Sequence, residues 1–224
     1  MSTSNITVRE FDKKASGYES NRMSPWYLAH ADHIFKKMSF KPGDTVLDIG
    51  CGTGYLLRQI ARANPQVTGF GIDLSPRMIE VASQKAADEN LGNLTFHQSN
   101  WEALNETTKT LLVSQAASHV ICANAFHYFA DPHKALTSMH SALTPEGEVL
   151  LLERAKEGSV LSVAWDFAHR FLIKDNVRFY DTPSIIEMLK KTNFCQVQVK
   201  LKIKKFFWKN KIYTSVALIS GIKR

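Results

Sequence analysis

The residues best suited to chemistry lie in one short stretch, residues 46–54, with the sequence VLDIGCGTG. An apolar run carries an acid near its end, a glycine-rich turn follows, and the residues after the turn have helical spacing. This order predicts a strand, a tight turn and the N-terminus of a helix. Glycine permits a positive φ in such a turn and, because it has no Cβ, lets a ligand approach the backbone.

The acid in this stretch, Asp48, narrows the choice of ligand. It precedes Gly50 by two residues, at the carboxyl end of the predicted strand. A carboxylate there would repel a pyrophosphate, and the spacing G-x-G-x-G differs from the G-x-G-x-x-G of dinucleotide-binding turns. The same carboxylate would attract a cation, such as the ammonium of a methionine moiety, and would favour a nearby sulfonium.

A second acid, Asp73, ends the next predicted strand and lies 19 residues after Gly54. An acid at this place can accept hydrogen bonds from ribose hydroxyls. Ser75 and Pro76 then fit the N-cap and the first position of a helix. The alternative is that Asp73 is itself a helix cap.

These motifs resemble those of class I S-adenosylmethionine (SAM)-dependent methyltransferases. Residues 11–19 (FDKKASGYE) resemble the F-D-x-x-A-x-x-Y-(D/E) opening of a subgroup of that class. The subgroup includes ubiquinone/menaquinone C-methyltransferases, malonyl-carrier-protein O-methyltransferases and some tRNA-modifying enzymes. Residues 124–132 and 143–153 resemble its motifs L-H-H-x-x-D-P and L-x-P-G-G-x-L-x-x-x-(D/E). The resemblance covers about residues 11–220.

The resemblance implies an α/β fold, a doubly wound Rossmann-like sheet of seven strands in the order 3-2-1-4-5-7-6, with strand 7 antiparallel. Residues 1–42 would form an N-terminal helical segment covering the cofactor site. Residues 43–224 would form the SAM-binding domain, with a substrate-cap insertion at about 154–183. The alternating, lysine-rich residues 196–204 fit an edge strand, and the apolar residues 212–220 fit a strand buried on both faces.

The resemblance also implies which residues hold SAM. They are Tyr18, Asp48, Gly50, Cys51, Gly52, Gly54, Asp73, Leu74, Met78, Asn100, Trp101 and Asn124. Asn100 replaces the family's aspartate, and its amide oxygen could accept from the adenine amino group without charge. Trp101 could stack on adenine or cover the sheet edge, and Met78 could lie against adenine or pack on the sheet.

The acceptor site would be shaped by Tyr18, His127, Trp165, His169 and Arg170. His127 is the candidate catalytic residue, because a histidine can act as a base near neutral pH. The alternatives are that His127 packs against its neighbours and that the helical stripe around Trp165 belongs to the core. The expected reaction is in-line transfer of the sulfonium methyl to a small molecule. No metal-binding spacing is present, so no metal is expected.

Composition bounds these expectations. A chain of 224 residues suits one domain, and it has no apolar run long enough to span a membrane and no apolar N-terminal signal. Its cysteines, Cys51, Cys122 and Cys195, lie far apart, which favours reduced thiols and a cytoplasmic location.

The net charge of +7 is concentrated at the C-terminal end, where residues 195–224 hold seven lysines, one arginine and no acid. An edge strand is one explanation of this charge. The alternative is a tRNA or other nucleic-acid methyltransferase that uses the basic strand as a phosphate track; a membrane surface is also possible. A second alternative is a SAM-binding protein without catalysis.

Overall fold

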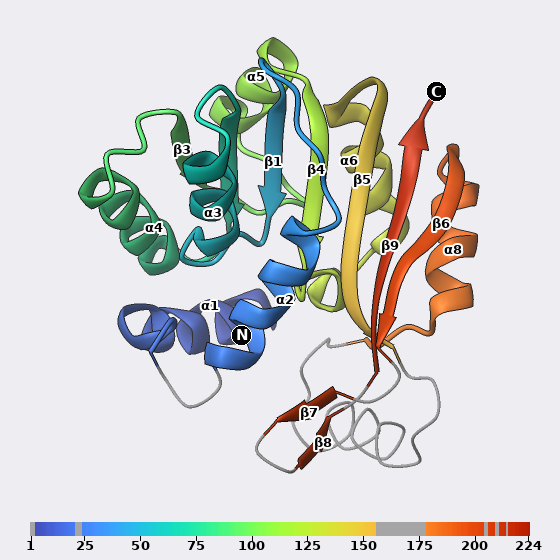
Figure 1. Cartoon of the computed structure of the whole chain (residues 1–224), viewed down its shortest axis with the longest axis horizontal. Coiled ribbons are helices and arrows are strands. Elements are labelled where there is room, and N and C mark those ends of the chain that lie inside the picture. The colour runs from blue at the N-terminus through green and yellow to red at the C-terminus, as the bar shows by residue number, and fades with distance from the viewer. Residues whose placement is uncertain (1–2, 21–23, 156–177, 204–205, 209–210, 214) are drawn as a thin grey trace.

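The computed structural model describes residues 3–20, 24–155, 178–203, 206–208, 211–213 and 215–224. Its main sheet has seven strands in the order β3-β2-β1-β4-β5-β9-β6 (Figure 1). Strand β9 runs antiparallel to both of its neighbours, and the other pairs are parallel. This is the predicted order, with β9 as the seventh strand.

The strands of this sheet are β1 (Thr45–Ile49), β2 (Thr68–Asp73), β3 (Leu94–Gln98), β4 (Ala117–Ala123), β5 (Leu143–Ala155), β6 (Phe194–Ile203) and β9 (Ser215–Lys223). The α-helices are α1 (Thr3–Lys14), α2 (Ser24–Phe35), α3 (Tyr55–Ala63), α4 (Pro76–Asp88), α5 (Glu106–Ser114), α6 (Pro132–Ala142) and α8 (Thr182–Lys191). Two short 3-10 helices are η1 (Ala15–Gly17) and η2 (Phe126–Tyr128).

The last strand starts later than the sequence predicts. Residues 212–220 read as one apolar strand, but β9 begins at Ser215. The segment before it pairs elsewhere, because β8 (Lys211–Tyr213) forms a separate antiparallel pair with β7 (Phe206–Trp208). Figure 1 shows this small pair below the main sheet.

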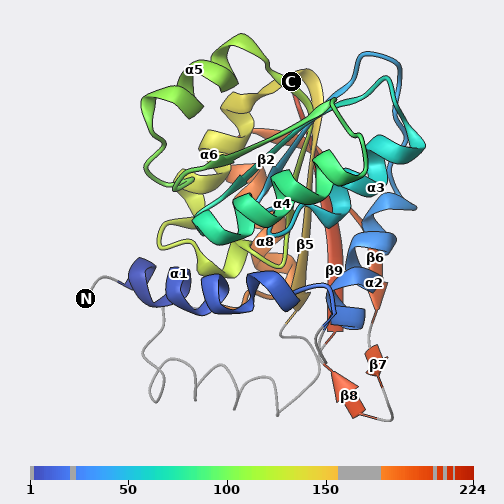
Figure 2. The same cartoon turned by 90° about the vertical axis from the view of Figure 1, so that its left-hand side faces the viewer.

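The core lies on both faces of the sheet, as the alternation of its strands requires. One cluster joins Leu47 and Ile49 of β1 to α6 and α8, and the other joins Val46 to α2 and α3. Figure 2 shows the helices on the two sides of the sheet. Helix α1 crosses below the end at which the β1 arrow points in Figure 1, so it lies by the carboxyl ends of the parallel strands.

Candidate active site

A cavity of about 590 Å³ opens at the carboxyl ends of β1, β2, β4 and β5. Doubly wound sheets bind their ligands at this place. Its walls include the turn after β1, the end of β2, the segment after β4, and residues of α1 and α2. The predicted cofactor residues that line it are Tyr18, Asp48, Gly50, Cys51, Gly52, Asp73, Leu74, Met78, Asn100, Trp101 and Asn124.

Two glycines of the turn have separate tasks. Gly50 has φ 73°, and a Cβ there would lie 2.4 Å from the Cβ of Ala125, so the turn packs directly on the segment after β4. Gly52 has φ 54°, and a Cβ there would meet only the Tyr18 ring, at 3.9 Å. The backbone is therefore bare toward the cavity at Gly52, which is where a ligand can approach it.

Gly54, also predicted to bind the cofactor, is not among the residues that line the cavity. A Cβ at this position would lie 2.6 Å from the ring of Phe96 on β3. The residue precedes the first residue of α3. The contacts of Gly54 therefore indicate that the missing Cβ lets the start of α3 pack closely on the sheet.

Asp48 is a buried carboxylate at the cavity wall, with 3% of its surface exposed. Among the described residues, no donor hydrogen-bonds to its carboxyl group. Burial, and after it the charge of Asp73, raises the pKa of Asp48 to about 7. A buried carboxylate without a partner is costly, so this site favours a ligand that brings a cation.

Asp73 ties two binding segments together. One carboxyl oxygen accepts from the backbone N–H of Gly52 and the other from that of Ser75, both at 2.9 Å. Burial raises the pKa of Asp73, although these N–H groups act in the opposite direction. Ser75 caps α4, accepting from the N–H of Met78 at 3.1 Å. The N-cap of α4 is therefore Ser75, as predicted, and the alternative that Asp73 is itself the helix cap is wrong. Asp73 accepts from the backbone of the capping residue and lines the cavity.

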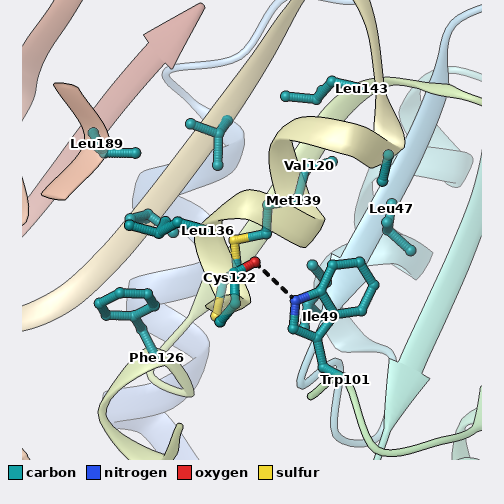
Figure 3. Close-up of a cluster of buried hydrophobic side chains, with 14 of the residues drawn as sticks. Leu47, Ile49, Trp101, Val120, Cys122, Phe126, Leu136, Met139, Leu143 and Leu189 are labelled. Atoms are coloured by element: carbon teal, nitrogen blue, oxygen red, sulfur yellow. Dashed lines mark hydrogen bonds between the residues drawn. The ribbon is translucent and has the colours of Figure 1, made fainter. Parts of the chain in front are cut away.

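Trp101 and Asn100 are held by the protein itself. Trp101 is 4% exposed, and its indole N–H donates to the carbonyl oxygen of Ala135 on α6 at 3.1 Å. Figure 3 shows its ring in the core beside Ile49. The side-chain oxygen of Asn100 accepts from the N–H of Glu102 at 3.0 Å. Both residues also reach the cavity wall.

His127, the candidate catalytic residue, sits in η2 with 7% exposure and lines the cavity. Its Nδ1 lies 2.7 Å from Oε2 of Glu153 at the end of β5. The other oxygen of Glu153 accepts from the N–H of Phe126, also at 2.7 Å. The His127 ring contacts the rings of Tyr128, at 4.3 Å between centroids, and Phe179, at 5.2 Å.

Glu153 was not among the predicted site residues, although it is the final acid of the motif in residues 143–153. It is 2% exposed. A carboxylate accepts hydrogen bonds, so Nδ1 of His127 carries the hydrogen in this contact. The remaining ring nitrogen, Nε2, is then the one that can accept a proton.

Asn124 adopts φ 55° directly after β4, and its amide oxygen lies 3.1 Å from Nδ1 of His30 on α2. Burial lowers the pKa of His30 to about 3, so that histidine is neutral.

Tyr18 lines the cavity from the segment after α1. The other predicted acceptor residues, Trp165, His169 and Arg170, lie outside the described residues.

In the described part of the chain, no group of three or more histidine, cysteine or acidic side chains is placed to hold a metal ion. Within the same residues, no helix combines the length and the apolarity that crossing a membrane requires.

A family model for a methyltransferase domain matches residues 40–217 of this sequence. The chain belongs to this methyltransferase domain family. Malonyl-acyl-carrier-protein O-methyltransferase of Halalkalibacterium halodurans is 31% identical in an alignment of 149 residues that covers 63% of this chain and 52% of that relative. Ubiquinone biosynthesis O-methyltransferase of Actinobacillus pleuropneumoniae is also 31% identical, over 64% of this chain and 63% of its own length. The present chain therefore spans less than two thirds of the length of either relative.

Solved structures agree on the fold. Phosphoethanolamine N-methyltransferase 2 of Haemonchus contortus, in complex with S-adenosyl-L-methionine, aligns with a TM-score of 0.74 at 17% identity. The alignment covers 100% of this chain and 60% of that one. At this identity the likeness supports the methyltransferase architecture alone.

Proposed function

We propose that the protein transfers the methyl group of SAM to a small-molecule acceptor. The observation that carries the proposal is the buried Asp48, which accepts no hydrogen bond from any described residue, beside the bare backbone of Gly52 in one cavity. An ammonium on the ligand would compensate Asp48, and the missing Cβ at Gly52 leaves room for the ligand chain. Membership of the methyltransferase family and the SAM-bound fold relative support the same cofactor.

Bound SAM supplies an electrophilic methyl group on its sulfonium. In the proposed site Asp48 holds the ammonium of the methionine end, and Asp73 lies within the same wall to accept from the ribose. In this proposal Tyr18 and the residues of α1 that line the cavity shield the bound cofactor from water. The task left to the protein is to hold the acceptor in line.

His127 acts as the base in this proposal. Glu153 fixes the ring through Nδ1 and stabilises the imidazolium that forms when Nε2 takes a proton. This arrangement serves an acceptor whose nucleophilic atom must lose a proton, such as a hydroxyl. The names of the curated relatives include O-methyltransferases, which supports a protic oxygen as the acceptor.

A nucleic-acid acceptor gains little support from the described residues. Lys200 on the basic edge strand β6 pairs with Glu148 of β5 at 2.6 Å. The lysine therefore has a structural partner within the sheet. The small-molecule relatives favour the first proposal.

We also propose a cytoplasmic location, which the three unpaired cysteines support.

The proposal is tested with SAM that carries a labelled methyl group. Purified protein is incubated with the small-molecule fraction of a cell extract and, separately, with its RNA, each at two salt concentrations. Label in the small-molecule fraction, independent of salt, is the expected result. Label in RNA that falls steeply with salt would favour the nucleic-acid alternative. SAM binding without transfer to either fraction would favour a non-catalytic protein.

A further inference from the structure

An ion network joins the N-terminal segment, residues 3–20, to the turn after β1. Glu19 follows Tyr18 directly, and its Oε1 accepts from the hydroxyl of Thr53 and from Arg58, both at 2.6 Å. Its Oε2 lies 2.9 Å from Nζ of Lys85. One carboxylate therefore contacts the glycine-rich turn, helix α3 and helix α4.

Two of the three donors to Glu19 are buried. The Arg58 side chain is 3% exposed and Thr53 is 2% exposed, and the Glu19 side chain that accepts from them is 16% exposed. Burial raises the pKa of Glu19, but hydrogen bonds from Thr53, Lys85 and Arg58 outweigh it, and the pKa lies below its ordinary value. Charge-assisted contacts of this kind are the stronger hydrogen bonds of proteins.

Arg58 does not depend on Glu19 for a partner. It also pairs with Glu89 just after α4, and Glu89 is held by Arg62 at 2.7 Å. Pairing of α3 with the end of α4 is thus complete without the N-terminal segment. What Glu19 adds is a link from that segment to the buried arginine and to Thr53, which stands between Gly52 and Gly54.

A second link fastens the same segment to the start of α4. Asp12 of α1 accepts from the hydroxyl of Ser75 at 2.5 Å and from the N–H of Arg77 at 3.4 Å. Ser75 follows Asp73 by two residues. Figures 1 and 2 both place α1 beneath α4, in keeping with this contact. Tyr18 lies between the two links and Phe11 directly precedes Asp12, and both residues line the cavity.

We propose that Glu19 is a positioning residue that fastens the N-terminal segment to the glycine-rich turn and so couples closure of the segment to SAM binding. The proposal rests on the proposed function for its ligand. A ligand under a cover binds with an apparent affinity scaled by the fraction of molecules in which the cover is in place. Loss of the Glu19 charge lowers that fraction and leaves the ligand contacts themselves intact.

The test compares Glu19→Gln with Glu80→Gln, which removes an exposed ion pair with Arg77 on the same helix as Lys85. S-adenosylhomocysteine (SAH) is titrated by calorimetry, and amide hydrogen exchange of residues 3–20 is followed with and without it. Glu19→Gln should weaken SAH about tenfold, as expected for loss of hydrogen bonds to a charged group. It should also speed exchange in residues 3–20, while Glu80→Gln should match the wild type in both measurements.

Lys85→Gln provides a second variant that spares the buried arginine, since the Lys85 side chain is 34% exposed. A smaller change in the same direction is expected. Unchanged SAH affinity and unchanged exchange in both variants would overturn the proposal, as would weaker binding with exchange unchanged. If the wild type binds neither SAM nor SAH, the proposed function fails and the coupling with it. The exchange data then still show whether Glu19 fastens the segment.

Discussion

Replacing Asp48 by asparagine should make the ligand-free protein more stable relative to the wild type as the pH rises from 5 to 8. The carboxyl group is 3% exposed, and its pKa rises from an ordinary value of 3.8 to about 7. Because the folded pKa exceeds the unfolded one, the unfolded chain releases this proton first. The stability linked to this group is therefore fully present below about pH 4 and is lost as the pH rises through 7.

The two pKa values fix the size of the effect. Their difference corresponds to roughly 4 kcal/mol of lost stability above pH 7, of which about 2–3 kcal/mol is lost between pH 5 and pH 8. The Asp48→Asn variant has no charge at either pH. The difference in free energy of unfolding between the variant and the wild type should therefore rise by about 2–3 kcal/mol, in favour of the variant, from pH 5 to pH 8. The cost of burying the amide cancels in this comparison, because it is the same at both pH values.

Urea unfolding followed by tryptophan fluorescence, without ligand, measures the difference at pH 5, 6, 7 and 8. Asp88→Asn, at an exposed aspartate at the end of α4, serves as the control and should show no such trend. A difference that stays constant with pH, or shrinks toward pH 8, would refute the view that Asp48 is an uncompensated buried carboxylate.

Further predictions concern the turn, the core and the proposed base. Gly50→Ala should destabilise the fold by about 3 kcal/mol or more in urea, because φ is positive there and the new Cβ would lie only 2.4 Å from the Cβ of Ala125. Gly92→Ala, with no atom within 4 Å of an added Cβ, should cost almost nothing. Trp101→Phe should cost about 1–3 kcal/mol through loss of its N–H bond, yet leave SAH affinity within a few-fold; a large loss of affinity would favour stacking on adenine. His127→Asn should lower kcat by roughly 10²–10⁴ and Glu153→Gln by a smaller factor, each with SAH binding retained; full activity in His127→Asn would remove the base from the mechanism.

The strand order was predicted from the resemblance to a known family, and that resemblance was recognisable because the motifs that carry it are local. The acid and glycines of residues 46–54 mark a strand, a turn and a helix start within one short stretch. Alternating and continuous apolar strands then distinguish the edge of the sheet from its interior, as β6 and β9 confirm. The separate pairing of β7 and β8 was missed, since an apolar run does not show where a strand leaves one sheet for another.

The contacts of the site depend on neighbouring strands and were harder to predict. Glu153 meets His127 because Ala123 of β4 pairs with Leu152 of β5, which brings the two chain segments out of the sheet side by side. No pattern within either segment specifies that register. Trp101 is similar, because its partner Ala135 lies on α6, 34 residues away. Helix α5 was missed because its stretch is mostly polar, with Asn105 as the clearest helix signal.

We propose that the cavity beside Asp48 and Gly52 binds SAM. Calorimetric titration of the wild type and of Asp48→Asn with SAH at pH 8, where Asp48 is mostly ionised, tests it most directly. We expect the wild type to bind SAH in the micromolar range and the variant to bind it about tenfold to a hundredfold more weakly, as for loss of a buried charge-assisted contact. Equal affinity in the two proteins, or no binding by the wild type, would contradict it.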